Sequence, residues 1–236
     1  MSCAASENTR DAKPILTLEA VSFAYAQGKP VFSDVYLDVC NGSYMMVKGP
    51  SGAGKSTLLR LMNRLEEPNS GRILYHGREL VEYEPARLRR WVSYIQQTPV
   101  LVNGSVRDNL LLPFGFTANK DLERPTDDEL QELLAAFLLD NVALDQNGLT
   151  CSVGQSQRLC LIRALLLKPE IMLLDEPTSA LDKESRQEVE AMTEKVNTEH
   201  GVTVVMISHT EYAPACENFS EIEVRGGSVT VKEQTP

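Results

Sequence analysis

Gly49-Pro-Ser-Gly-Ala-Gly-Lys-Ser-Thr57 is the stretch that decides the fold, because it fits the phosphate-binding pattern G-x-x-x-x-G-K-[ST]. Its glycines allow the backbone to curl so that successive N–H groups point inward and bind an anion. The lysine can reach the β- and γ-phosphates of a nucleotide, and the serine hydroxyl can join the coordination sphere of Mg²⁺. We expect the whole stretch to bind a nucleoside triphosphate: Gly49, Pro50, Ser51, Gly52, Ala53, Gly54, Lys55, Ser56 and Thr57.

The residues on either side of this loop support the same interpretation. Tyr44–Lys48 is a short apolar run that predicts a buried strand, and Thr57–Leu65 predicts a helix. A helix that begins at the loop points the positive end of its dipole at the bound phosphates. GTPases, kinases and motor ATPases share this arrangement, so a second motif has to decide between them.

That second motif is Ile171-Met-Leu-Leu-Asp-Glu176, an apolar strand that ends in two carboxylates. Adjacent side chains on a strand point to opposite faces, so the two acids cannot do the same job. Asp175 is placed to hold Mg²⁺ through its water shell. Glu176 can reach the water that attacks the γ-phosphate, a role worth about 10²–10⁴ in rate. Paired acids also end ordinary buried strands, so this block alone leaves both interpretations open.

From about Ile15 to Val231, the chain resembles the nucleotide-binding subunits of ABC transporters, with the motifs in the order of that family. Tyr25 follows the first predicted strand, where the family stacks adenine. Gln97 stands at the Q-loop, which senses Mg²⁺ and contacts the membrane subunit. The family pattern Gln-x-Pro favours Gln97 over its neighbour Gln96, and that alternative stays open.

The later motifs complete the resemblance. Cys151-Ser-Val-Gly-Gln155 occupies the position of the ABC signature, and Asp175–Asp182 that of the extended Walker B motif and D-loop. His209, after the predicted strand Val202–Ile207, matches the switch histidine. The resemblance implies an α/β P-loop NTPase of ABC type, with an antiparallel β subdomain and an α-helical subdomain. It implies ATP hydrolysis with ATP and Mg²⁺ as cofactors, catalysis by Lys55, Gln97, Glu176 and His209, and metal binding by Ser56, Gln97 and Asp175.

The signature departs from the usual Leu-Ser-Gly-Gly-Gln at Cys151 and Val153. The resemblance implies that the remaining Ser152, Gly154 and Gln155 face the γ-phosphate bound to the opposite subunit, at the N-terminus of a helix. A β-branched residue is tolerable at position 153 if its φ angle is negative. We therefore interpret the signature as functional, with a degenerate site as the alternative. Cys151 is interpreted as a small apolar substitute rather than a redox-active thiol.

Two further assignments have ordinary alternatives. Tyr25 could equally be a core aromatic of the first sheet. A lone histidine after an apolar strand is usually structural, but Val204–His209 matches the family's H-loop. The resemblance therefore implies that His209 contacts the γ-phosphate and holds the attacking water together with Glu176. His76 and His200 lack such a context, and His200 is expected at the solvent-facing end of a helix.

Composition narrows the setting. The 236 residues are 42% hydrophobic, which suits one nucleotide-binding unit with a real core. A formal net charge of −10 argues against a nucleic-acid groove and against adsorption to anionic lipid. The sequence contains neither an 18-residue apolar window nor a signal pattern, so no direct membrane insertion is expected. Five scattered cysteines without disulfide spacing fit a reducing cytosol. We expect a cytoplasmic protein that is peripheral on the cytoplasmic face of the (inner) membrane.

The expected domain organisation is simple. Residues 1–14 are expected to form a disordered tail, and residues 15–232 one ATPase domain with an α-helical subdomain at about 99–155. Asp127–Leu139 and Ser156–Leu167 predict helices, and Asp182 is expected to cap a long helix that Gly201 terminates. Arg225-Gly-Gly-Ser228 predicts a hairpin turn. The absence of internal repeats predicts one half of a homodimer.

An ATPase subunit of this kind needs an integral membrane permease as its partner. We expect the contact near Gln97–Asn109 and the helical subdomain, with Arg107 and Asp108 as its charged residues. Val92–Pro113 resembles the ATPase subunits of bacterial iron exporters of the FetA type, through a Tyr-x-x-Gln-Thr-Pro segment and Asp-Asn-Leu. A sugar, phosphate or lipid system stays open, as does a soluble ABC-type ATPase acting on the ribosome or DNA.

Overall fold

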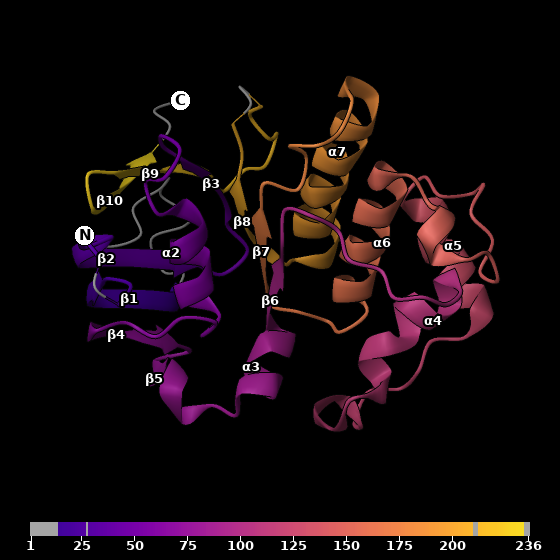
Figure 1. Ribbon diagram of the computed structural model, residues 1–236, viewed down its shortest axis with the longest axis horizontal. Coiled ribbons are helices and arrows are strands. Elements are labelled where there is room, and N and C mark those ends of the chain that lie inside the picture. The colour runs from indigo at the N-terminus through magenta and orange to yellow at the C-terminus, as the bar shows by residue number, and fades with distance from the viewer. Residues whose placement is uncertain (1–13, 27, 210–211, 234–236) are drawn as a thin grey trace.

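The computed structural model describes residues 14–26, 28–209 and 212–233, and Figure 1 shows their arrangement. The strands are β1 (Pro14–Phe23), β2 (Phe32–Cys40), β3 (Tyr44–Lys48), β4 (Ser70–Tyr75), β5 (Arg78–Glu79), β6 (Val92–Ile95), β7 (Ile171–Asp175), β8 (Thr203–Ile207), β9 (Phe219–Arg225) and β10 (Ser228–Glu233). The α-helices are α2 (Lys55–Met62), α3 (Pro85–Trp91), α4 (Val106–Leu111), α5 (Asp127–Ala136), α6 (Val153–Leu165) and α7 (Lys183–His200). Short 3-10 helices are η1 (Leu80–Glu82), η2 (Leu112–Gly115), η3 (Thr117–Asn119) and η4 (Gly148–Thr150). The predicted tail lies outside the described residues except for Pro14, which begins β1.

The strands form two sheets. An antiparallel sheet has the order β2-β1-β4-β5, and a six-stranded sheet has the order β10-β9-β3-β8-β7-β6. In the second sheet every neighbouring pair is parallel except β9 and β10, which form the terminal hairpin. Side chains alternate along β2, and Val35, Leu37 and Val39 are all buried.

Side-chain alternation in the larger sheet divides the core into two. On β3, Met45 and Val47 join the core that the sheet shares with α2 and the antiparallel sheet, whereas Tyr44 and Met46 join the core shared with α5, α6 and α7. The central strands β7 and β8 alternate in the same way. Strands covered on both faces are apolar throughout, as in other parallel sheets. The sheet therefore separates the phosphate-loop helix from the helical part of the chain.

Figure 1 shows this division, with α2 beside the antiparallel strands at the left and α4, α5 and α6 at the right. Residues 99–155 are described without a gap and contain helices and turns, with one isolated bridge between Ser105 and Asn147 in place of strands. None of the helices in the described chain has the length and apolar character that a membrane span needs.

The ends of the elements follow local chemistry. Asp182 caps α7 by accepting a hydrogen bond from the Ser185 N–H at 3.0 Å, and Gly201 ends the helix with a φ of 66°, as predicted. His200 is exposed at that end. The phosphate-loop helix begins at Lys55, two residues earlier than predicted, because the left-handed Gly54 (φ 100°) directs the chain straight into it.

One cysteine departs from the expectation that the five cysteines form no disulfide. Cys151, Cys160 and Cys216 are free thiols, but Cys40 is disulfide-bonded. The expectation that the cysteines form no disulfide is therefore wrong for Cys40. Spacing along a sequence does not show which side chains a fold brings together.

Candidate functional site

The motifs meet because of the strand order in the larger sheet. The phosphate loop follows β3, Asp175 ends β7, and Gln97 and His209 stand two residues beyond β6 and β8. The order β3-β8-β7-β6 makes these strands neighbours, and they are parallel. The carboxyl ends of parallel strands share one edge of the sheet, where open α/β sheets bind ligands. The fold therefore collects these motifs at one edge.

Two glycines of the phosphate loop have no room for a side chain. A Cβ on Gly49 (φ 149°) would lie 2.2 Å from the carbonyl oxygen of Val224, and one on Gly54 (φ 100°) would lie 2.6 Å from Cγ1 of Val31. Both φ values also lie in the region that favours glycine. The loop thus owes its shape to close backbone packing against β9 and the segment before β2.

Lys55 lies folded over this loop. Its Nζ donates hydrogen bonds to the carbonyl oxygens of Gly49 and Pro50, at 3.0 Å and 3.1 Å, and the side chain is buried. A buried ammonium group needs such partners, because an unpaired buried charge is strongly destabilising. The positive charge is thereby held at the mouth of the loop.

Asp175 is the buried acid of the site, with 5% of its surface exposed. Its Oδ1 accepts a hydrogen bond from Oγ of Ser56 at 2.9 Å, and its Oδ2 accepts one from the Tyr94 hydroxyl at 2.6 Å. Burial, and the hydrogen bond to Asp175 after it, raise the pKa of Tyr94 to about 12, so the phenol keeps its proton. Tyr94 was not among the predicted site residues, although it is the tyrosine of the Tyr-x-x-Gln-Thr-Pro segment.

Glu176 stands next in the chain and has a left-handed backbone, with a φ of 48°. Such a conformation costs about 1–3 kcal/mol in a residue other than glycine and is common at functional sites. The Glu176 carboxylate accepts a hydrogen bond from Nε2 of Gln97 at 3.3 Å and lies 2.8 Å from Nε2 of His209. Three predicted residues from three separate loops are thus joined through one carboxylate.

Ser179, which was not predicted, supports this arrangement from the D-loop segment. Its hydroxyl accepts a hydrogen bond from Nε2 of Gln97 at 3.0 Å and donates one to the Glu176 carbonyl at 3.1 Å. The neighbouring Gln96 instead lines a surface groove together with Pro99 and Val100. Gln97, not Gln96, therefore reaches the Glu176 carboxylate.

Tyr25 lies at the other end of the phosphate loop. Its hydroxyl is 3.1 Å from Oγ1 of Thr57, and its ring meets Phe23 edge-on with centroids 4.9 Å apart. With 42% of its surface exposed, Tyr25 is not the core aromatic that was the alternative interpretation. An open aromatic face beside the loop suits a stacking partner.

The signature residues begin α6 as a self-contained cap. Ser152 Oγ accepts a hydrogen bond from the Gln155 N–H at 3.2 Å, and Gln155 Oε1 accepts one from the Ser152 N–H at 2.9 Å. Val153 is the first helical residue, has a negative φ and is 51% exposed, so the β-branched substitution fits without strain. A Cβ on Gly154 would lie 3.0 Å from Oγ of Ser185, which leaves little room there for a side chain.

The signature and the phosphate loop are not brought together within the chain. Figure 1 places α6 across the larger sheet from α2. Among the described residues, no hydrogen bond joins Ser152, Gly154 or Gln155 to the phosphate loop. The thiol of Cys151 has a pKa raised by burial, the opposite of what a reactive thiol needs.

A large groove lies elsewhere, between β1 and β2 on one side and β9 and β10 on the other. It is lined by none of the predicted site residues. Its size therefore does not alter the assignment of the site to the carboxyl edge of the parallel strands.

Comparisons with known proteins agree with this geometry. Residues 32–179 match the family described as ABC transporter. The chain is 39% identical over 183 residues to ABC transporter I family member 17 of Arabidopsis thaliana, covering 78% of this chain and 68% of that protein. It is 33% identical over 196 residues to the probable iron export ATP-binding protein FetA of Escherichia coli (strain K12), covering 83% of this chain and 85% of that protein.

The fold comparison gives the same result. A dimeric ATP-binding cassette, solved in a post-hydrolysis state with ADP and Pi, matches with a TM-score of 0.76 at 24% identity, covering 92% of this chain and 98% of the other. Other relatives are longer, and the chain spans 52% of one and 15% of another. The family match takes in the phosphate loop, the signature and the Asp175–Glu176 pair. The chain is an ATP-binding ATPase and belongs to the ABC transporter family.

Proposed function

We propose that this ATPase is the subunit that powers a membrane ABC transporter, and that it works as an ATP-driven dimer with Mg²⁺ as second cofactor. The observation that carries the proposal is the position of the Glu176 carboxylate. It is joined to Gln97 and His209 at the sheet edge that holds the phosphate loop. A base held in this way serves hydrolysis rather than nucleotide binding alone.

Nucleotide binding is assigned to the loop and the residues around it. The backbone N–H groups of residues 51–57 take the phosphates, and the Lys55 ammonium exchanges the carbonyls of Gly49 and Pro50 for phosphate oxygens. Tyr25 stacks on adenine. The family resemblance is the basis for this last contact, and the exposed ring beside Thr57 is compatible with it.

The metal is assigned to Ser56 and Asp175, with Gln97 at its edge. The Ser56 hydroxyl and the Asp175 carboxylate lie 2.9 Å apart, and both are hard oxygen donors of the kind that Mg²⁺ prefers. Bound there, the ion would neutralise charge on the β- and γ-phosphates. The residues present therefore fit the ion.

The chemistry is assigned to Glu176 and its neighbours. The carboxylate accepts a proton from the attacking water, which contributes about 10²–10⁴ in rate. His209 and Gln97 hold that carboxylate from either side, so it needs little reorganisation at the moment of reaction. In the same assignment His209 also contacts the γ-phosphate.

The signature is assigned to the partner's nucleotide. Ser152, Gly154 and Gln155 lie away from this chain's own phosphate loop, so a second copy related by a two-fold axis would bring its signature to that loop. The dimeric state of the structural relative supports this assembly. The cap of α6 is closed by a neutral glutamine, which adds no negative charge near the phosphates.

Docking on the permease is assigned to the groove beside the Q-loop. Gln96, Pro99, Val100 and Cys160 line it with Arg163, whose Nη2 donates a hydrogen bond to the Val100 carbonyl at 3.0 Å. The groove lies where the residues after β6 meet α6, next to Gln97, for which the resemblance implies a contact with the membrane subunit. A location on the cytoplasmic face of the membrane follows from the same assignment.

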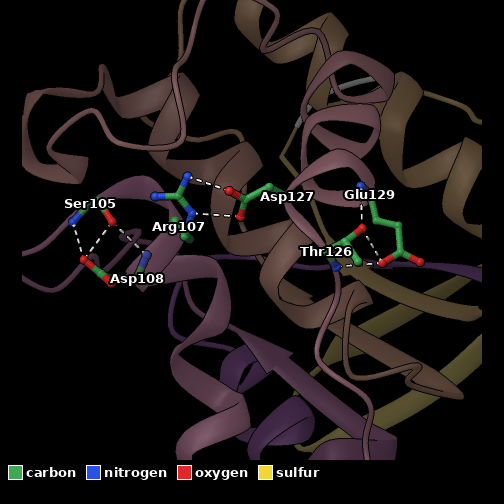
Figure 2. Close-up of polar contacts among 6 residues, drawn as sticks. All are labelled: Ser105, Arg107, Asp108, Thr126, Asp127 and Glu129. Atoms are coloured by element: carbon green, nitrogen blue, oxygen red, sulfur yellow. Dashed lines mark hydrogen bonds and ion pairs between the residues drawn. The ribbon is translucent and has the colours of Figure 1, made fainter.

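Arg107 and Asp108 are less suitable contacts than the sequence suggests. Figure 2 shows Arg107 in a two-bond ion pair with Asp127, with both N–O distances 2.9 Å. Asp108 closes the cap of α4 with Ser105, as Glu129 closes the cap of α5. Reversing either charge would loosen these helices, so a loss of permease binding would not identify an interface.

We also propose that residues 15–232 form one domain, with its helical part at 99–155. Iron export is the transport function that we propose, on the basis of the FetA similarity. The test is to purify the protein from native membranes. An integral membrane partner should accompany the wild-type chain, and vesicles holding the complex should move Fe²⁺ only with ATP. Recovery with ribosomes or DNA alone would overturn the transporter assignment, and transport of another solute would overturn only the iron assignment.

A further inference from the structure

Tyr94, which the sequence did not predict as a site residue, donates a hydrogen bond to Asp175, the buried acid of the site. It lies on β6 in register with Leu173 of β7, two residues before Asp175. Side chains two residues apart on a strand share a face, so Leu173 and Asp175 both point toward the side covered by α2. The Tyr94 ring packs against the core on that same side. The strand register therefore aims the phenol at the carboxylate.

The two oxygens of Asp175 have different partners. Oδ1 faces Ser56, the predicted metal ligand, whereas Oδ2 accepts the short hydrogen bond from Tyr94. Because a carboxylate only accepts, the phenol is the donor in this hydrogen bond.

We propose that Tyr94 is a positioning residue for the Mg²⁺ site, which holds Asp175 by Oδ2 so that Oδ1 stays turned toward Ser56 and the metal. This inference rests on the proposed role of Asp175 in holding Mg²⁺. Without the phenol hydrogen bond the carboxylate can rotate, and the ion loses a fixed acceptor for its water shell. Partners of this kind behind metal ligands are worth about 10–100-fold in metal affinity.

The test is Tyr94→Phe, which removes the hydroxyl and leaves the ring in the core. Mg²⁺ is titrated at a fixed concentration of a non-hydrolysable ATP analogue, and nucleotide binding is followed by the rise in melting temperature. The Mg²⁺ concentration that gives half of the full rise in melting temperature, called here the Mg²⁺ half-effect, should increase about 10–100-fold. Nucleotide binding in excess EDTA and the melting temperature of the free protein should stay close to those of the wild type.

Tyr83→Phe is the matched control, because its hydroxyl also makes one hydrogen bond, to the Tyr75 carbonyl at 2.8 Å, away from the phosphate loop. It should leave the Mg²⁺ half-effect unchanged. An equal shift in both variants, or none in Tyr94→Phe, would overturn the positioning role.

Asp175→Asn separates this inference from the proposed function. If Tyr94 acts through the carboxylate, Tyr94→Phe should cause no further shift in the Asp175→Asn background. A full additional shift in the double variant would mean that Tyr94 acts by another route. If Asp175→Asn alone leaves the Mg²⁺ dependence unchanged, the proposed metal site itself is wrong.

Discussion

The phosphate loop and the signature helix differ in how far the chain completes them. Around the phosphate loop, Lys55 has two carbonyl partners, Asp175 has two hydroxyl partners, and Glu176 lies between Gln97 and His209. The signature residues Ser152 and Gln155 bond to each other, and half of the Val153 surface is exposed. The first region is a site that one chain builds alone. The second is a surface that, in the proposed function, acquires its role through another copy.

The strongest test of the self-contained region is Glu176→Gln. The amide keeps the shape but cannot take a proton, so hydrolysis should fall by about 10²–10⁴. ATP should remain bound and hold the dimer closed, because a ligand that binds one state stabilises that state. Phosphate release and molecular mass by light scattering with Mg-ATP measure the two effects. Hydrolysis within a few-fold of the wild type would remove Glu176 from the chemistry.

The matching test of the shared region is Ser152→Arg. A large charged side chain at the partner's γ-phosphate shell should weaken the ATP-dependent dimer by about 2 kcal/mol or more, about thirtyfold in affinity. The monomer should still bind ATP, because its own phosphate loop is intact. Analytical ultracentrifugation and equilibrium nucleotide binding distinguish the two steps. A Ser152→Arg monomer that hydrolyses ATP at the normal rate would refute the shared site.

A charge reversal in the groove beside the Q-loop should have a smaller effect, on association with the membrane partner. Arg163→Glu should weaken association with the membrane partner about five- to tenfold, since interface side chains that matter cost more than about 1 kcal/mol. ATP binding by the isolated chain should not change. Arg225→Glu, on the exposed hairpin between β9 and β10, is the control, and co-purification from membranes is the measurement. An equal loss for both variants would indicate a general charge effect.

The smallest effect concerns the helix caps. Hydrogen bonds from Ser105 lower the pKa of Asp108, and those from Thr126 lower the pKa of Glu129, whereas Gln155 in the α6 cap does not titrate. A lowered folded-state pKa adds stability above the unfolded pKa, which is lost as the pH falls through the folded value. Below about pH 4, the first turns of α4 and α5 should therefore open before that of α6, and hydrogen exchange of their backbone amides measures this opening.

Glu129→Gln is the sharpest check of this difference between caps. It gives α5 the same neutral cap as α6, so the protection of its first turn should no longer depend on pH over that range. Continued loss of protection in this variant, to the same extent as in the wild type, would show that other groups control the opening of α5.

Much of the fold could be predicted because local chemistry and global packing agree. The apolar runs of β3, β7 and β8, the cap at Asp182 and the turn at Gly226–Gly227 are all legible as short patterns. The motifs named from the sequence lie together because the strands that they follow are parallel neighbours, and the roles of their residues stay predictions. Tyr94 and Ser179 were missed because their contacts depend on strand register and on loop conformation. The ion pair of Arg107 with Asp127 joins residues twenty positions apart, which no periodicity reveals.

The loop after β6 has a mechanical consequence. Gln96 lines the groove proposed for the membrane partner, and Gln97 donates a hydrogen bond to the Glu176 carboxylate. Successive Cα atoms are about 3.8 Å apart. One peptide unit therefore separates the residue that lines the groove from the residue that contacts the proposed base. The two contacts therefore belong to adjacent residues, with no intervening residue between them.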